Sequence, residues 1–286
     1  MPSTYNDIYI ELRNALRSNN IASYNLEARV IICSASGKTN TEYLRDMALY
    51  ATPKIEAKAK DMLERRLCGE PVAYITNSWE FYGLPFYITP DVLIPRMDTE
   101  VVVDAAVEIL RYMGKFDARI LDLCCGSGCI GCAIANEFPA SRIVEIDLSA
   151  RALEVCRKNV ELNHMTPRTM FIQTDAKSMP PMGIGTFDLI VCNPPYIPSD
   201  MIPKLDASVR DYEPVWALDG GTDGLDFYRK IIKNWKRLLR NGGYMIFEIG
   251  EGQDEILKKL FLTNGYHNVE YRQDTLNTNR VVMARI

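Results

Sequence analysis

A strand, a glycine-rich loop and a helix follow one another from Arg119 onward, and this succession restricts the possible folds more than any other feature. Arg119 to Leu123 has the apolar pattern of a short buried strand. The next residues fit the pattern G-x-G-x-x-G with Gly126, Gly128 and Gly131, and small residues from Cys129 to Asn136 predict a helix. Glycines let the backbone turn tightly and direct the N–H groups of the helix at a ligand. A parallel α/β sheet with a ligand at this loop is therefore expected.

A second strand and its terminal acid indicate which ligand binds. Ser141 to Ile146 reads as the next strand and ends at Asp147, about twenty residues beyond the loop, where a carboxylate can accept hydrogen bonds from ribose hydroxyls. An adenosyl cofactor fits this arrangement, either a nicotinamide dinucleotide or S-adenosylmethionine. Hydride transfer usually needs an acid or base such as histidine near the nicotinamide ring. The two histidines, His164 and His267, fall at a helix end and in the C-terminal tail.

The segment Asn193-Pro194-Pro195-Tyr196 favours methyl transfer over hydride transfer. It follows Phe187 to Cys192, which reads as a buried strand. The side-chain oxygen of Asn193 and the carbonyl oxygen of Pro194 can each accept a hydrogen bond, and Tyr196 offers a flat face. Two acceptors and a ring suit a planar NH2 group that is held as a nucleophile. Pro-Pro can also simply end a strand, so the segment alone does not decide the function.

The remainder of the chain predicts two further parts. Residues 1–76 carry apolar residues at helical spacing with polar breaks, which indicates a small helical bundle for recognition of a macromolecular partner. Residues 77–98 are aromatic and β-like, with a turn marked by Gly83 and Pro85, and predict a hairpin that links the domains. Residues 99–286 alternate helix and strand, which predicts a doubly wound, mostly parallel sheet that closes with a hairpin of 268–272 and 280–285.

Composition limits the class of protein. The N-terminal residues are polar, and no apolar run approaches the roughly 18 residues that span a membrane, so we expect a cytoplasmic enzyme. Eight cysteines in a chain of 286 residues read as reduced packing residues. Cys129 and Cys132 form the one C-x-x-C pair, and without a second pair nearby we expect no metal. A net charge of −4 disfavours a nucleic-acid partner.

Several segments give the chain a family resemblance. They are Gly69 to Tyr74, Phe81 to Leu84, Ile94 to Glu100, Asp122 to Ile130, Asn193 to Tyr196, Glu213 to Leu218, Gly220 to Leu225 and Phe247 to Gln253. With them the chain resembles the protein-(glutamine-N5) methyltransferases that modify peptide chain release factors, the PrmC/HemK family. The resemblance implies a class I (Rossmann-like) methyltransferase domain behind a helical domain that engages the release factor. It also implies S-adenosyl-L-methionine as cofactor and the glutamine of a Gly-Gly-Gln loop as substrate, and we expect a monomer.

The resemblance also assigns roles to individual residues. It implies a cofactor site made of Cys124, Cys125, Gly126, Ser127, Gly128, Asp147, Asp175, Ala176 and Asn193. It implies that Asn193, Pro194, Pro195, Tyr196 and Arg96 bind the glutamine substrate, with Asn193, Pro194 and Tyr196 as the catalytic group. No strong general base is required, because the amide proton can leave after the methyl group has been transferred.

The chain departs from the family pattern in two places. Cys124 and Cys125 stand where a glycine and a small hydroxyl residue are usual, so Cys124 needs either a negative φ or some strain. Ala176 stands where many members carry an aromatic ring. Three other functions remain open from the sequence: glutamine methylation of a ribosomal protein, adenine-N6 methylation of nucleic acid, and an inactive adapter that binds release factor.

Overall fold

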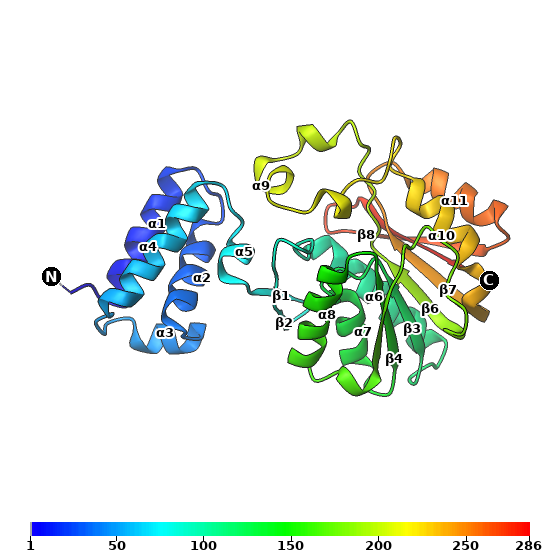
Figure 1. Cartoon of the computed structure of the whole chain (residues 1–286), viewed down its shortest axis with the longest axis horizontal. Coiled ribbons are helices and arrows are strands. Elements are labelled where there is room, and N and C mark those ends of the chain that lie inside the picture. The colour runs from blue at the N-terminus through cyan, green and yellow to red at the C-terminus, as the bar shows by residue number, and fades with distance from the viewer. Residues whose placement is uncertain (1) are drawn as a thin grey trace. The chain divides into compact units, whose positions relative to one another are not determined.

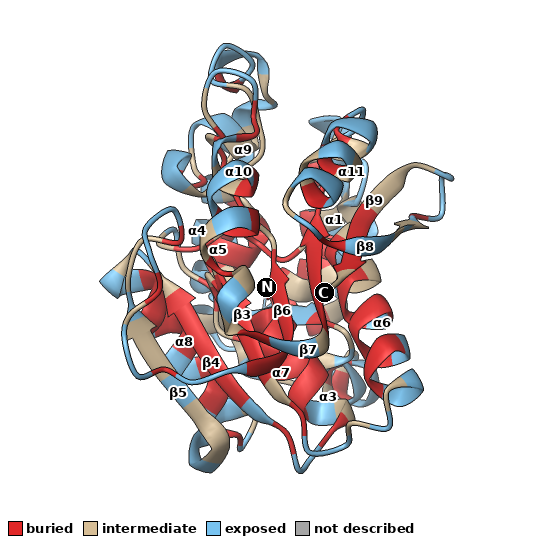
Figure 2. Ribbon diagram, turned by 90° about the vertical axis from the view of Figure 1, so that its right-hand side faces the viewer, coloured by how far each residue is buried: buried red, intermediate tan, exposed pale blue. Residues whose placement is uncertain are grey.

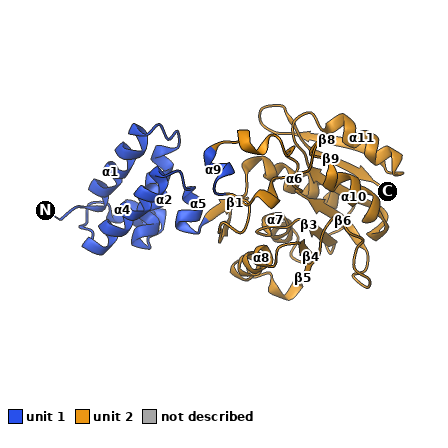
Figure 3. Cartoon of the chain, turned by 45° about the horizontal axis from the view of Figure 1, so that its top comes forward, with its two compact units in different colours: residues 1–78, 207–212 blue, residues 79–206, 213–286 orange. Residues whose placement is uncertain are grey.

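The computed structural model describes residues 2–286 and divides them into two compact units (Figure 3). The first unit runs from the N-terminus to Ser78 and also includes Ala207–Tyr212. The second unit consists of Trp79–Asp206 and Glu213–Ile286. A six-residue segment from the second half of the sequence therefore belongs to the N-terminal unit, which no feature of the sequence indicated.

The first unit is a bundle of helices (Figure 1): α1 Tyr5–Ser18, α2 Tyr24–Ser36, α3 Asn40–Asp46, α4 Pro53–Leu67 and α5 Val72–Thr76. Its core contains apolar residues at helical spacing, such as Ile8, Leu12 and Leu16 of α1. A partly buried ion pair of 2.5 Å between Arg66 Nε and Glu27 Oε2 joins α4 to α2. The segment from the second half of the sequence carries the short helix α9 (Ala207–Arg210), and after it Tyr212 donates a 2.8 Å hydrogen bond to the Cys68 carbonyl.

The second unit is a mixed α/β domain around a seven-stranded sheet in the order β5-β4-β3-β6-β7-β9-β8. The strands are β3 Arg119–Leu123, β4 Arg142–Asp147, β5 Thr169–Gln173, β6 Phe187–Cys192, β7 Leu239–Glu248, β8 His267–Gln273 and β9 Asn279–Arg285. The first five are parallel, and the final two form an antiparallel hairpin on β7. The principal helices are α6 Met97–Tyr112, α7 Cys129–Glu137, α8 Ala150–Leu162, α10 Asp226–Asn234 and α11 Asp254–Thr263. The doubly wound fold expected from the sequence is confirmed.

Strand order places a ligand site at one point of this sheet. The chain passes outward from β3 through β4 to β5, and then returns to β6 on the other side of β3. Ligands of open α/β sheets bind at such a reversal, beyond the carboxyl ends of the strands. All six residues of β6 are buried because helices cover both faces of the sheet (Figure 2).

The linking hairpin is shorter than the sequence indicated. Strands β1 (Trp79–Phe81) and β2 (Leu84–Phe86) pair around Tyr82 and Gly83, which both have positive φ. Pro85 was expected to mark the turn but lies within β2, opposite Glu80. Beyond Phe86 the chain runs without regular strand or helix to α6, and part of this connection lines the candidate site.

Candidate functional site

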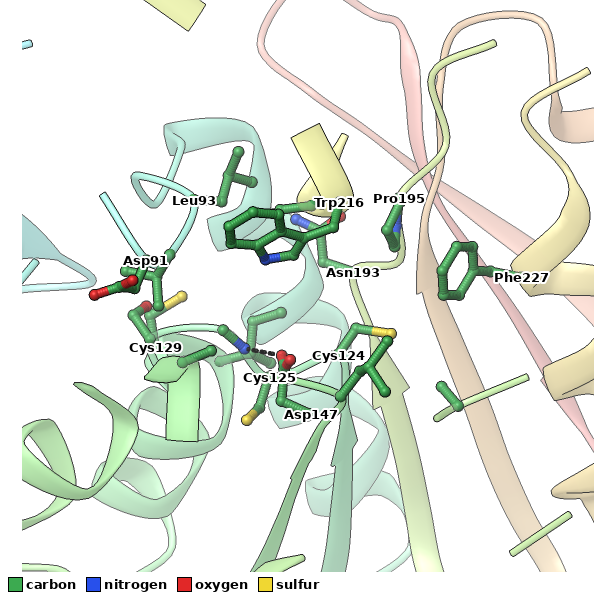
Figure 4. Close-up of a pocket in the computed structure, with 18 of the residues that line it drawn as sticks. Asp91, Leu93, Cys124, Cys125, Cys129, Asp147, Asn193, Pro195, Trp216 and Phe227 are labelled. Atoms are coloured by element: carbon green, nitrogen blue, oxygen red, sulfur yellow. Dashed lines mark hydrogen bonds between the residues drawn. The ribbon is translucent and has the colours of Figure 1, made fainter. Parts of the chain in front are cut away.

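A mostly apolar cavity lies at the carboxyl ends of β3, β4 and β6, where the strand order reverses (Figure 4). Most of the site residues expected from the sequence line it: Cys124, Cys125, Gly126, Ser127, Asp147, Asp175, Ala176, Asn193 and Pro195. Four expected residues, Arg96, Gly128, Pro194 and Tyr196, are not part of its wall.

The glycine loop turns through three left-handed residues. Cys124, Gly126 and Gly128 have φ values of 57°, 53° and 76°. Cys124 therefore adopts the strained alternative rather than a negative φ, as a non-glycine residue in the left-handed region. Gly128 packs closely against α8, because a Cβ added there would lie 2.5 Å from Cys156 Sγ.

Asp147 at the end of β4 fastens the loop. Its Oδ2 accepts a 2.9 Å hydrogen bond from the Gly126 N–H, and its Oδ1 accepts one of 2.8 Å from the Ser149 N–H. Burial raises the pKa of the Asp147 carboxyl, although these backbone bonds act in the opposite direction. A carboxylate has about four acceptor positions, so Asp147 keeps acceptor capacity for a ligand in the cavity that it lines.

An aromatic ring reaches the cavity near Ala176 from a different element. Phe227 of α10 lines the same cavity as Ala176, and Lys177 Nζ lies 4.7 Å from the centre of its ring. Trp216 lines the cavity as well and is 58 % exposed. The site thus has aromatic surface for a flat ligand even though position 176 supplies none.

Asn193 presents a free acceptor at the cavity (Figure 4). Its Nδ2 donates a 3.4 Å hydrogen bond to Thr99 Oγ1 of α6. Within residues 2–286, neither Asn193 Oδ1 nor the Pro194 carbonyl oxygen accepts a hydrogen bond. Both acceptors that the sequence assigned to a planar NH2 group are therefore available.

Tyr196 is held in place by other parts of the domain. Its ring packs against the core rather than facing the cavity, and its hydroxyl donates a 3.1 Å hydrogen bond to Glu248 Oε1. Burial raises the pKa of the Glu248 carboxyl, while the nearby Thr99 and Tyr196 hydroxyls lower it. The Tyr196 carbonyl accepts a 3.0 Å bond from Gln253 Nε2. These two hydrogen bonds fix the segment that carries Asn193, and contact of the half-buried Tyr196 ring with substrate stays a prediction.

Arg96 is also engaged elsewhere. Its guanidinium forms an ion pair with Glu213, which is buried, and the Glu213 carboxylate accepts a 3.3 Å bond from the Ile94 N–H. The pair joins the connection before α6 to the segment after Tyr212. In this structure Arg96 holds the wall of the site together, and its contact with substrate stays a prediction.

The sequence did not identify Thr99, Phe227, Trp216 or Glu248 as site residues. Each lay inside a family segment or beside one, but only the fold brings them to the end of β6. His164 and His267 are not part of the cavity wall, which agrees with their assignment outside the site. No helix in the described part of the chain is long and apolar enough to cross a membrane.

Comparisons with known proteins define the class of this domain. Residues 99–202 match a family model described as "Methyltransferase small domain", and residues 7–76 match one described as "PrmC N-terminal domain". The catalytic domain of hMettl16 in complex with MAT2A 3'UTR hairpin 6 has the same fold, with a TM-score of 0.58, 18% identity and coverage of 78% of this chain and 81% of that one. The second unit is a class I methyltransferase domain.

Full-length relatives identify the family. The chain is 36% identical to a release factor glutamine methyltransferase of Geobacter sulfurreducens over 96% of its own length and 94% of the relative. It is 40% identical to a release factor glutamine methyltransferase of Bradyrhizobium diazoefficiens over 86% of its own length and 82% of the relative. The chain belongs to the release factor glutamine methyltransferase family.

Proposed function

We propose that this enzyme transfers a methyl group from S-adenosyl-L-methionine to the side-chain N5 of the glutamine in the Gly-Gly-Gln motif of peptide chain release factors. The observation that carries the proposal is the pair of free acceptors, Asn193 Oδ1 at the cavity wall and the carbonyl of Pro194, the next residue. A primary amide offers two N–H donors to match them. Family membership supplies the protein substrate class.

The cavity fits the cofactor by the chemistry of its walls. Gly126 brings the backbone close, Asp147 has acceptor positions left for ribose hydroxyls, and Phe227 offers a ring beside Ala176 and Asp175 for adenine. The methionine part would lie along Cys124 to Gly128. S-adenosylmethionine, when bound, supplies an electrophilic methyl group on a positively charged sulfonium.

The residues of the chain act by positioning the amide. Asn193 Oδ1 and the Pro194 carbonyl hold its two N–H groups, so that the face of the nitrogen points into the cavity. Thr99 orients Asn193, and Glu248 orients Tyr196 and with it the backbone of the segment. The largely apolar wall excludes water, which favours a step in which positive charge is lost at the sulfonium. Orientation of this kind can contribute up to roughly 7–11 kcal/mol.

The N-terminal unit is proposed to orient the release factor. The helices of residues 2–78 hold no residue of the cavity wall, yet the family model for this region matches residues 7–76. A second binding surface raises the effective concentration of the target loop. We further propose that the enzyme works as a cytoplasmic monomer, with release factor rather than nucleic acid as its partner, in keeping with its net charge of −4.

The test is a methylation assay with labelled S-adenosylmethionine and separate substrates. Intact release factor should be labelled, and a release factor with the Gly-Gly-Gln glutamine changed to alanine should not. Ribosomal proteins and an adenine-containing RNA serve as the other arms. Labelling of the alanine variant, or stronger labelling of either other arm, would overturn the proposed substrate.

A further inference from the structure

A buried group of sulfur and oxygen ligands lies behind the cofactor loop. Cys125 Sγ, Cys156 Sγ and a carboxylate oxygen of Glu145 are all within 4.8 Å of one another. The three residues come from the loop, from α8 and from the middle of β4, and all are buried. This trio differs from the C-x-x-C pair Cys129 and Cys132, which drew attention in the sequence.

No positively charged side chain in the described part of the chain pairs with Glu145, whose carboxyl has the Cys125 thiol and the Asp122 carboxyl beside it. Neither of its carboxylate oxygens has a hydrogen-bond partner, and the residue is completely buried. Asp122 lies directly opposite it in the β3–β4 register, is equally buried, and has a free Oδ1. No ion pair within residues 2–286 involves either residue. Buried carboxyls are normally paired, protonated or bound to a metal ion.

The surroundings make room for the carboxylate. A Cβ added at Gly131 would lie 2.1 Å from Glu145 Oε1, so α7 has no side chain at the point where it passes this group. The Gly131 N–H, in the first turn of α7, donates a 2.9 Å hydrogen bond to Asp122 Oδ2. The positive end of the α7 helix therefore favours the charged form of Asp122. Burial raises the pKa of Glu145 and raises that of Asp122 to about 7, so a proton neutralises these carboxyls when no cation is bound.

We propose that Cys125, Cys156 and Glu145 bind a thiophilic divalent cation such as Zn²⁺. Two thiolates and one carboxylate at this spacing suit a tetrahedral ion with Zn–S bonds of about 2.3 Å and Zn–O bonds of about 2.1 Å. Asp122 is placed to supply the fourth ligand or to hydrogen-bond to Glu145. The thiols lose two protons on binding, and Glu145 loses a third wherever it is protonated, so affinity rises with pH.

The ion would join the cofactor loop to the elements beneath it. Cys125 lines the cofactor cavity and belongs to the loop, whereas Cys156 and Glu145 belong to α8 and β4. Binding would hold Cys125 at a fixed distance from both elements. The site is thus expected to stabilise the domain and to set the shape of the loop without taking part in methyl transfer.

The test is a titration of chelator-treated, fully reduced full-length protein with Co²⁺ and then Zn²⁺. We expect one Co²⁺ per chain by equilibrium dialysis, a thiolate-to-cobalt charge-transfer band, and displacement by Zn²⁺ with a rise in Tm. Cys156→Ser and Glu145→Gln should each weaken binding at least about tenfold and weaken the band. Cys192→Ser is the matched control, since Cys192 is also completely buried but lies outside the trio, and it should bind as the wild type does.

Either of two results would overturn the proposal. One is binding well below one ion per chain without a charge-transfer band in the wild type. The other is equal affinity of the Cys156→Ser and Cys192→Ser variants. If a single variant fails to fold, Gly131→Ala combined with Glu145→Ala replaces the carboxylate with apolar volume at the same place. This double variant should fold without metal and lose Zn²⁺-dependent stabilisation, and retained stabilisation would equally refute the site.

Discussion

Replacement of Asn193 by alanine tests whether the segment after β6 positions the substrate amide. In the structure Asn193 Oδ1 is a free acceptor at the cavity, and its Nδ2 is anchored on Thr99 at 3.4 Å. Alanine removes one of the two acceptors for the glutamine NH2 while leaving the backbone and the Pro194 carbonyl in place. By analogy with deletion of one oxyanion-hole donor, the loss should be roughly 2–4 kcal/mol of transition-state stabilisation, or about 30- to 1,000-fold in kcat.

The assay is single-turnover methylation of intact release factor, with cofactor affinity measured by calorimetry on the same protein. Asn193→Ala should keep the cofactor Kd within about twofold, because Asp147 and the loop that it fastens are untouched. Thr99→Val is the comparison variant, since it removes only the anchor. A 3.4 Å bond is long, so its loss should cost at most about 1 kcal/mol. Near wild-type turnover by Asn193→Ala, or an equal loss in both variants, would refute the acceptor role.

Three further predictions follow from other parts of the site. Asp147→Asn should weaken S-adenosylmethionine binding by roughly 1.5–3 kcal/mol in calorimetry, and an unchanged affinity of this variant would remove Asp147 from the site. Because burial raises the pKa of Asp147, the affinity of the wild type should begin to fall at a pH above the ordinary aspartate value of 3.8 as the pH is lowered. Burial raises the folded pKa of Asp122 to about 7 from 3.8, so the free energy of unfolding of the metal-free protein should fall as pH rises through that window, by up to ~4 kcal/mol. Asp122→Asn should reduce this slope in urea titrations and leave the part that comes from Glu145, whose pKa burial also raises; an unaltered slope would contradict the prediction. A truncation that starts at Trp79 should raise KM for intact release factor far more than it changes the rate on a short Gly-Gly-Gln peptide, and equal efficiency on both substrates would leave the first unit a packing role.

The sequence was most informative where neighbouring residues alone determine the backbone. The strand before Cys124, the glycine loop and the terminal acid Asp147 follow from local patterns, so they could be predicted together with the parallel sheet. Side-chain orientation was less accessible. The Tyr196 hydroxyl, for example, donates its hydrogen bond to Glu248, which lies 52 residues away in the sequence. No local pattern specifies such a partner, since it depends on β6 and β7 being neighbours in the sheet.

The same limit applies to the buried cluster behind the loop. Cys125, Glu145 and Cys156 are spread over about thirty residues of sequence, and each alone reads as a packing residue or a strand residue. A glutamate in the middle of a buried strand conflicts with the apolar pattern of that strand, and such conflicts mark functional or strained sites. The structure adds two facts that the sequence does not give: Asp122 lies opposite Glu145 in the β3–β4 register, and Gly131 leaves space for the Glu145 carboxylate.

The short segment Ala207–Tyr212 determines how the truncation experiment must be designed. It belongs to the first unit, where Tyr212 bonds to the Cys68 carbonyl, and the next residue, Glu213, carries the ion pair with Arg96 at the wall of the site. Removal of residues before Trp79 therefore also frees this segment. Tyr212→Phe in the full-length chain removes the hydrogen bond but keeps the first unit. If freeing the segment were what harms activity, this variant would show lower kcat on the short peptide as well as on release factor. A wild-type peptide rate in Tyr212→Phe, together with a raised KM of the truncation for release factor alone, would assign the loss to recognition by the first unit.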